Sequence, residues 1–262
     1  MNHAVNPAAH RPAASSLARR AWPIALLGCV AVLSLLVQPV PAALLASAPE
    51  LAALPPLALR AVLLVNPCVL VLVAAVVGAA LAHRSGLRSM LAGTASSAGW
   101  AATAAQAAAG GFALGLALAA ADAAAAPFMG PAWQALVDTA PRGAAATAMG
   151  MLYGGVAEEV MLRWGAMSLV AWALARLLRS RGRGMAMSLA IAVSAGLFAA
   201  GHLPALAAQL DLTFAVVTRT LLLNTVAGLL YGWLFWRHHL EAAMAAHAAT
   251  HLGLAAWRLL AA

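Results

Sequence analysis

Two adjacent glutamates and an arginine, Glu158, Glu159 and Arg163, stand in a stretch of the chain that is otherwise apolar. An ionisable group at the centre of a membrane costs at least about 2.5–3.5 kcal/mol, so it is a candidate functional group by default. On a helix, Glu159 and Arg163 share a face, whereas Glu158 is turned away by about 100°. The arginine can therefore neutralise one carboxylate while the other faces a cavity. Such a free carboxylate can take a proton from water as a general base, although a lone buried Glu–Arg pair more often only locks helices together.

Three histidines follow in later apolar stretches. His202 comes four residues after Phe198 in FAAGHLP, and His247 and His251 are four residues apart in AAMAAHAATHLG. Two histidines at this spacing share one face of a helix, which is a spacing of metal ligands. Each histidine taken alone is more often a hydrogen-bonding residue than a catalyst. Since the earlier apolar stretches hold almost no ionisable residues, we expect the first half of the chain to supply packing and the second half to supply chemistry.

The composition indicates which elements must position these side chains. Of the 262 residues, 65% are hydrophobic and only 8% are charged, whereas a soluble domain is about half apolar and a quarter charged. Because a membrane-crossing helix needs about 20 apolar residues, we expect an all-α polytopic membrane protein with about seven transmembrane helices. They are predicted over residues 23–45, 59–82, 103–121, 144–178, 185–206, 213–236 and 240–260.

The fourth of these stretches, residues 144–178, is too long for one straight crossing, so we expect it to be tilted, broken or partly surface-lying. Along ideal helices, Glu158 lies about 32 Å from Arg179, but His247 lies only about 12 Å from His239. His247 would therefore be too shallow to meet Glu158 unless the fourth stretch breaks or re-enters the membrane, and a break is predicted.

The placement of arginine predicts the orientation, because cytoplasmic loops carry an excess of Lys and Arg. If residues 1–20 form a disordered cytoplasmic N-terminus, four basic groups fall on the cytoplasmic side. The net charge of +8 is spread over these groups, and with no continuous basic patch we expect no nucleic-acid partner. The groups are Arg11, Arg19 and Arg20; His83, Arg84 and Arg88; Arg176, Arg179, Arg181 and Arg183; and Arg237, His238 and His239.

The order of the three motifs resembles the CPBP intramembrane proteases, the CAAX prenyl endopeptidase and bacteriocin-processing family, also called type II CAAX proteases or the ABI family. That family has Glu-Glu-x-x-x-Arg, then Phe-x-x-x-His, then a late His followed four residues on by Asn or Asp. The corresponding stretches here are EEVMLR, FAAGH and HAATH, and the resemblance covers about residues 154–254. His251 departs from the pattern, because it stands where the family has Asn or Asp.

The resemblance implies an all-helical intramembrane endopeptidase whose catalytic core spans residues 144–262, preceded by packing helices in residues 21–143. Glu158 would be the general base that activates water, and Glu159 with Arg163 would hold the helix and tune that base. The three histidines would bind the water, stabilise the oxyanion or hold a metal. Two alternatives stay open, namely a zinc ion held by His202, His247 and a carboxylate, or a mechanism in which Glu158 acts with histidine donors alone. The candidate catalytic set is Glu158, Glu159, Arg163, His202, His247 and His251.

The implied substrate is a membrane-associated protein or peptide, and the implied location is the lipid of a bacterial plasma (inner) membrane, which the chain crosses several times. Two other functions are consistent with the same residues. A proton-coupled transporter would use the Glu and His side chains as a relay, and a catalytically idle scaffold or immunity protein would use them only for packing. Replacement of Glu158 by Gln separates these alternatives, because only the protease would lose a cleavage activity.

Overall fold

The computed structural model describes residues 16–40, 42–139, 143–178 and 182–260, and no strand occurs in this part of the chain. Arg11, Arg179 and Arg181 lie outside it, as does most of the N-terminal segment that the sequence predicted to be disordered. Labels with η mark 3-10 helices, except η4 and η5, which are π-helices. The elements are α1 (Leu17–Val32), η1 (Leu33–Val37), α2 (Ala42–Ser47), α3 (Pro49–Ala52), α4 (Pro56–Leu81), η2 (Ala82–Ser85), α5 (Trp100–Ala125), η3 (Ala126–Phe128), α6 (Pro131–Thr139), α7 (Ala144–Met149), η4 (Gly150–Glu158), η5 (Val160–Met167), α8 (Ser168–Leu177), α9 (Arg183–Ala200), α10 (Leu203–Ala207), α11 (Phe214–Arg237) and α12 (Leu240–Leu260).

The prediction of an all-helical membrane protein with about seven spans is confirmed. Within the described residues, 6 helical segments are long and apolar enough to cross a membrane. The seventh predicted span forms as the helix α12, but it is less apolar and is not one of the six. The six segments are Leu17–Val37, Pro56–Ser85, Trp100–Phe128, Ala144–Leu177, Arg183–Ala207 and Phe214–Arg237.

The first span begins earlier than predicted. Residues 17–20, which the sequence placed in a disordered segment, form the first turn of α1. The hydroxyl of Ser16 accepts a hydrogen bond from the backbone N–H of Arg19 at 3.3 Å, and this contact satisfies one of the free donors at the start of a helix. The helical run then ends at Val37 rather than at residue 45.

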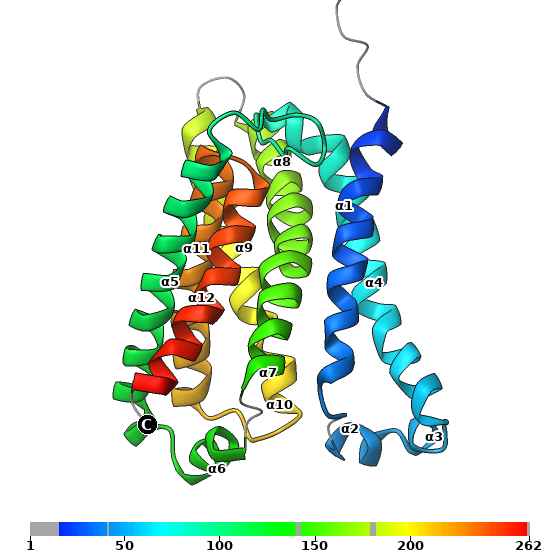
Figure 1. The fold of residues 1–262 in the computed structure, drawn as a ribbon, viewed down its shortest axis with the longest axis vertical. Coiled ribbons are helices and arrows are strands. Elements are labelled where there is room, and N and C mark those ends of the chain that lie inside the picture. Colours follow the sequence, from blue (N-terminus) through cyan, green and yellow to red (C-terminus); the bar gives the residue numbers. More distant parts are fainter. Residues whose placement is uncertain (1–15, 41, 140–142, 179–181, 261–262) are drawn as a thin grey trace, which may run out of the picture.

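The fourth span is the central element of the bundle. Figure 1 shows the long helices roughly parallel to the vertical axis, with α1 and α4 on one side, α5, α11 and α12 on the other, and the run from α7 to α8 between them. Within that run, η4 contacts α1 and α12, while η5 contacts α4 and α9. The run that carries the glutamates and the arginine therefore contacts helices from both halves of the chain.

The helix α12 is packed backbone to backbone between α5 and η4. A Cβ atom added at Gly111 of α5 would lie 1.9 Å from the carbonyl oxygen of Ala246, and one added at Gly155 of η4 would lie 2.8 Å from the Cβ of Ala248. Small residues allow helices in a membrane to approach this closely. Because α5 belongs to residues 21–143, the N-terminal part of the chain also helps to position the histidines of α12.

The predicted break in the fourth span is wrong. Residues 144–177 form one continuous helical run, and its middle part is a π-helix rather than a kink or a re-entrant loop. A π-helix bonds each residue to the fifth residue along the chain, so it has more residues in each turn and advances less per residue than an α-helix. This shorter advance accommodates part of the excess length of the span.

The depth of His247 has a second explanation at the other end of α12. The backbone N–H of Leu240 donates to the carbonyl of Arg88 at 3.0 Å, and a carboxylate oxygen of Glu241 accepts from the hydroxyl of Ser89 at 2.6 Å and from the backbone of Leu91 at 3.0 Å. The helix therefore begins beneath the segment that joins α4 to α5 and not at the surface. Counting residues from the helix start underestimates how deep His247 lies.

Candidate active site

Glu159 and Arg163 form a fully buried ion pair in the middle of the fourth span. The Nη1 atom of Arg163 lies 3.2 Å from Oε1 of Glu159, and both side chains are 0% exposed. The Nη2 atom of Arg163 also donates a hydrogen bond to the carbonyl of Gly228 in α11 at 3.1 Å. Removing charges from water costs several kcal/mol per ion unless a partner and hydrogen bonds compensate. The predicted pairing is confirmed, and it explains how the interior tolerates both charges.

Two aromatic rings enclose the guanidinium group of Arg163. Its central carbon lies 4.7 Å from the ring centre of Phe198 in α9 and 5.3 Å from that of Tyr231 in α11. A planar, delocalised guanidinium is attracted to the faces of aromatic rings. Arg163 therefore joins η5, α9 and α11 around one charge.

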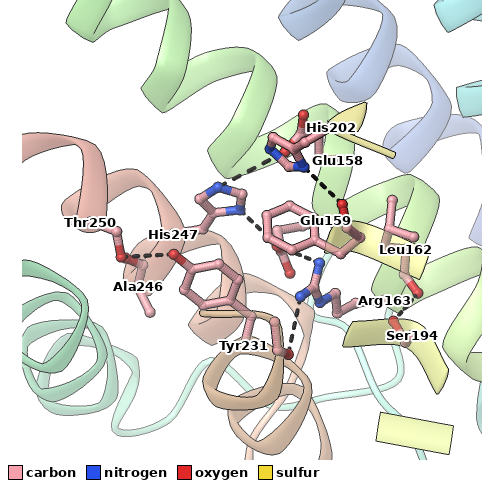
Figure 2. A network of polar contacts seen from close by, with 12 residues as sticks. Glu158, Glu159, Leu162, Arg163, Ser194, His202, Tyr231, Ala246, His247 and Thr250 are labelled. Carbon is pink, nitrogen blue, oxygen red and sulfur yellow. Dashed lines mark hydrogen bonds and ion pairs between the residues drawn. The ribbon is translucent and has the colours of Figure 1, made fainter. Parts of the chain in front are cut away.

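His247 connects this ion pair to the second glutamate. Its Nδ1 atom lies 2.8 Å from Oε1 of Glu159, and its Nε2 atom lies 4.0 Å from Oε2 of Glu158. Figure 2 shows the His247 ring between the two carboxylates, with Arg163 on the far side of Glu159. The side chain of Glu158 is 19% exposed, whereas that of Glu159 is fully buried. Of the two glutamates, Glu158 is therefore the one that is free of the arginine and accessible.

The hydrogen bonds fix which nitrogen of each ring carries a hydrogen. A carboxylate or a carbonyl only accepts, so the Nδ1 atom of His247, which contacts Glu159, is a donor. The Nδ1 atom of His202 lies 2.8 Å from the carbonyl oxygen of Phe198 and is a donor for the same reason. In the neutral form of both rings, Nε2 therefore presents a free electron pair.

His202 is placed by Phe198 rather than by a glutamate. Its ring lies edge-on to the ring of Phe198, with centres 4.8 Å apart, and Phe198 in turn meets the His247 ring edge-on at 5.5 Å. Phe198 lies in the last turn of α9, and His202 follows two residues after the end of that helix. Because the two residues are four apart, the Phe-x-x-x-His motif places the rings of Phe198 and His202 on the same side of the chain. Within the described residues, no ion pair links His202 to Glu158.

His251 lies one turn further along α12 than His247. The two rings are stacked, with centres 5.3 Å apart and planes inclined by 15°. They fit against η4 because of two glycines: a Cβ atom at Gly150 would lie 2.4 Å from Nδ1 of His251, and one at Gly154 would lie 2.6 Å from Nε2 of His251 and 3.1 Å from Nε2 of His247. His251 also lines a cavity of about 380 Å³, so it stands between the buried polar cluster and an open space.

The structure thus brings Glu158, Glu159, Arg163, His247 and His251 into one connected cluster and adds His202 through Phe198. Two further members were missed from the sequence. Tyr231 stacks on His247, with ring centres 4.4 Å apart and planes inclined by 15°. Its hydroxyl donates to Oγ1 of Thr250 at 2.8 Å. The chain has only 2 tyrosines, and a tyrosine in an apolar span needs a hydrogen-bond partner for its hydroxyl. The presence of Tyr231 in an apolar span could therefore have indicated a buried polar contact.

The donor set was compared with the needs of a zinc ion. Histidines that bind zinc usually donate their other ring N–H to a carboxylate or a carbonyl, and His247 and His202 both do this. Zinc in a catalytic site takes three protein ligands. Within the part of the chain that the structure describes, no group of three or more His, Cys, Asp or Glu side chains is arranged to hold a metal ion. Imidazole is a ligand that zinc accepts, but no third ligand converges on His202 and His247 among the described residues.

Comparison with known proteins gives one match. Residues 140–253 match the family model described as type II CAAX prenyl endopeptidase Rce1-like. No curated protein and no solved structure matches the chain. The matched segment contains Glu158, Glu159, Arg163, His202, His247 and His251, which confirms the resemblance inferred from the three motifs. Residues 140–253, the segment that forms the whole polar cluster of this membrane protein, are therefore similar to the Rce1-like type II CAAX prenyl endopeptidase family.

Proposed function

We propose that the chain is an intramembrane endopeptidase that hydrolyses peptide bonds of membrane-associated proteins or peptides, with Glu158 as the general base. The observation that carries this proposal is the separation of 4.0 Å between Oε2 of Glu158 and Nε2 of His247. One water molecule can form hydrogen bonds of about 2.8 Å to two atoms at this separation. A water held there would have a proton acceptor on each side and a carboxylate that is free of the arginine.

The proposed reaction begins with attack of that water on the carbonyl carbon of the substrate. The water oxygen forms the new bond to carbon while Glu158 takes its proton, and the carbonyl oxygen becomes an oxyanion. Glu158 then returns the proton to the nitrogen of the leaving amine as the C–N bond breaks. This sequence balances without any group beyond the chain, the water and the peptide.

Glu159 and Arg163 support the reaction through His247. Glu159 accepts the hydrogen of Nδ1 at 2.8 Å and therefore fixes the orientation of the ring, with Nε2 directed at the water. When the ring is doubly protonated, Glu159 balances its charge and Nε2–H can donate to the oxyanion. Arg163 in turn pairs with Glu159 and holds its carboxylate beside the ring. We assign Glu159 and Arg163 as positioning residues, with Tyr231 supporting the face of the ring.

A metal is a separate question. His202 and His247 would hold a zinc ion if one binds, and such an ion would polarise the substrate carbonyl. Because a third converging ligand is missing among the described residues, no step above depends on the ion. We expect cleavage to persist after treatment with a zinc chelator such as phenanthroline. Loss of cleavage, with recovery on addition of zinc and no recovery in a His247→Ala variant, would instead assign the ion to these imidazoles.

The central test is the Glu158→Gln variant. An amide cannot take the proton of water, so we expect cleavage to fall by roughly 100- to 10,000-fold. Since the substrate is not identified, the measurement is quantitative proteomics of membranes from cells that carry the wild-type or the variant chain, with a cleavage product present only for the wild type. Glu50→Gln is the matched control, because Glu50 is exposed in α3.

Two results would count against the proposal. If Glu158→Gln and the wild type give the same set of products, Glu158 is not the base. If instead the purified chain in vesicles carries a solute in response to a proton gradient, and Glu158→Gln stops that flux, the transporter alternative replaces the protease. A unchanged melting profile of Glu158→Gln in detergent is required in both cases, since it shows that the variant is folded.

A further inference from the structure

A cavity of about 380 Å³ leads from the surface of the bundle to the polar cluster. Its walls come from the end of the first span, the start of the fourth span and the last turns of α12, and they are mainly apolar. The residues that matter for the argument are Gln38, Ala145, Met149, Gly150, His251 and Arg258.

The inner end of the cavity reaches the site proposed above. His251 lines the cavity and stacks on His247, whose Nε2 atom is 4.0 Å from Glu158. Gly150, also in the wall, has no side chain to fill the space beside the His251 ring. An extended chain entering the cavity would therefore meet His251 first and the Glu158–His247 pair next.

The cavity opens at the end of the bundle opposite the basic loops. Figure 1 shows that α4, α8 and α11 end, and that α9 begins, at the same end of the bundle. Arg84, Arg88, Arg176, Arg183 and Arg237 lie at these helix ends or in the loop that follows η2. The helix α12 starts at that end, with Leu240 bonded to Arg88, and finishes at the opposite end with Arg258 in its last turn. Loops rich in arginine remain in the cytoplasm, so the cavity faces away from the cytoplasm.

Arg258 is the charged residue of the cavity wall. It is exposed and makes no ion pair with the residues that the structure describes. It lies eleven residues after His247, which is about 16 Å along an α-helix. An extended peptide advances about 3.3 Å per residue, so this distance corresponds to about five peptide residues.

We propose, on the basis of the proposed function, that an extended apolar peptide segment enters this cavity from the extracytoplasmic side, and that Arg258 selects segments with an acidic side chain about five residues from the cleaved bond. The apolar walls take the apolar side chains, and the guanidinium at the mouth pairs with the carboxylate. A lipid headgroup at Arg258 is the competing explanation. The peptide is favoured because the space continues inward along Gly150 to His251, which stacks on His247 of the catalytic pair, and a headgroup has no role there.

The side of entry is tested by cysteine labelling, independently of any cleavage. In a chain whose Cys29 and Cys68 are replaced by Ala, Ala145→Cys places a thiol in the cavity wall, and Ser96→Cys places one in the exposed loop at the basic end. With a membrane-impermeant maleimide, we expect Ala145→Cys to react in intact cells and Ser96→Cys to react only after permeabilisation. The reverse pattern would overturn the proposed side of entry and leave the proposed protease reaction intact.

The selectivity is tested with quenched-fluorescence apolar decapeptides that carry a single Asp, Asn or Lys, using the purified chain in detergent. A partly solvated ion pair is worth about 0.2–1 kcal/mol, so we expect the wild type to favour the Asp peptides over the Asn peptides by up to about fivefold. Arg258→Gln should remove this preference and Arg258→Glu should reverse it towards Lys. Arg183→Gln, at the exposed start of α9, is the matched control and should leave the preference unchanged.

Other outcomes separate the possible errors. If Arg258→Glu slows all three peptides equally, and does so only in vesicles with anionic lipid, Arg258 binds a headgroup and the peptide role is wrong. If the preference depends on Arg258 but Glu158→Gln cleaves as fast as the wild type, the cavity binds peptides and the proposed base is wrong. If the three peptides are cleaved equally by the wild type, the selectivity is wrong even where labelling confirms the side of entry.

Discussion

The pair α1 and α4 and the later helices that form the polar cluster are held together in different ways. Between α1 and α4, many contacts are apolar and close, as where a Cβ at Gly28 would lie 2.6 Å from Cγ1 of Val71, and one hydrogen bond runs from Arg20 to the carbonyl of Ala79 at 3.0 Å. In the cluster, an ion pair, a histidine and hydrogen bonds join η4, η5, α11 and α12. Helices can pack in lipid without a buried ion pair, so the buried charges of the cluster are retained for another reason. We assign that reason to chemistry.

The two regions also meet in a defined way. Trp164 of η5 donates its indole N–H to the carbonyl of Ala75 in α4 at 3.1 Å, and a Cβ at Gly78 would lie 2.3 Å from the same indole ring. Trp164 follows Arg163 directly, and the two side chains point to different sides of η5. One turn of the fourth span therefore separates a polar neighbourhood from an apolar one.

The sharpest way to test this contrast is to remove Arg163. In Arg163→Met, Glu159 stays buried without its partner, and loss of one member of a buried pair costs about 3–5 kcal/mol. Arg60→Met is the matched change in the first region, because Arg60 of α4 donates hydrogen bonds to the backbone carbonyls of Leu36 and Gln38 at the end of the first span. We expect this change to lower the free energy of unfolding by about 1 kcal/mol. Unfolding in mixed detergent micelles measures both.

A double variant completes this test. Glu159→Gln combined with Arg163→Met removes both charges, so it should recover much of the stability that Arg163→Met loses, although cleavage should stay low because His247 has lost its ionised partner. Equal destabilisation by Arg163→Met and Arg60→Met would remove the distinction between the two regions.

The next test compares the close approaches of helices. In Gly111→Ala the new methyl meets the backbone carbonyl of Ala246 at 1.9 Å, and since α12 must move, we expect a loss of about 1–3 kcal/mol. In Gly28→Ala it meets a side-chain methyl of Val71, which can shift, so the loss should be smaller. Gly110→Ala is the control, because nothing lies within 4 Å of its added Cβ. Equal losses at positions 28 and 111 would contradict the rigid packing of α12.

A smaller effect is expected for Tyr231→Phe. The change removes the hydrogen bond to Thr250 but keeps the ring that stacks on His247, so the free energy of unfolding should fall by about 1 kcal/mol with most of the cleavage retained. Tyr153→Phe, in η4 and partly exposed, is the control. A large loss of cleavage in Tyr231→Phe at unchanged stability would instead indicate that the hydroxyl contacts the substrate.

The smallest effect is a pH dependence at the buried start of α12. Burial lowers the pKa of His239 below its usual value, although the nearby Glu241 opposes this shift. Because the unfolded chain then binds the proton more readily than the folded one, stability should decrease as the pH falls below about 6.5. His239→Gln should flatten this part of the stability curve, measured as the melting temperature from pH 7.5 to 5. An identical slope in both proteins would show that His239 does not contribute.

Much of this arrangement is predictable from the sequence because lipid imposes simple rules. Spans follow from apolar length, and the pairing of Glu159 with Arg163 follows from their spacing of four. Tyr231 and Thr250 were missed because their contact depends on how α11 crosses α12, which no local pattern encodes. The depth of His247 was misjudged because the count assumed that all helices begin at one plane, whereas Leu240 begins beneath Arg88.

The π-helical stretch from Gly150 to Met167 has a consequence for how this segment tolerates change in length. Each residue turns the chain by about 100° in an α-helix and by somewhat less in a π-helix, which has more residues per turn, so loss of a single residue here would rotate everything on one side of the deletion relative to the other. Glu159 could then no longer face His247 while Trp164 still faced α4. A substitution within the stretch changes the contacts of one side chain, whereas deletion of one residue would change the direction in which all later side chains of the span point. We therefore expect insertions and deletions to be confined to the loops outside the stretch.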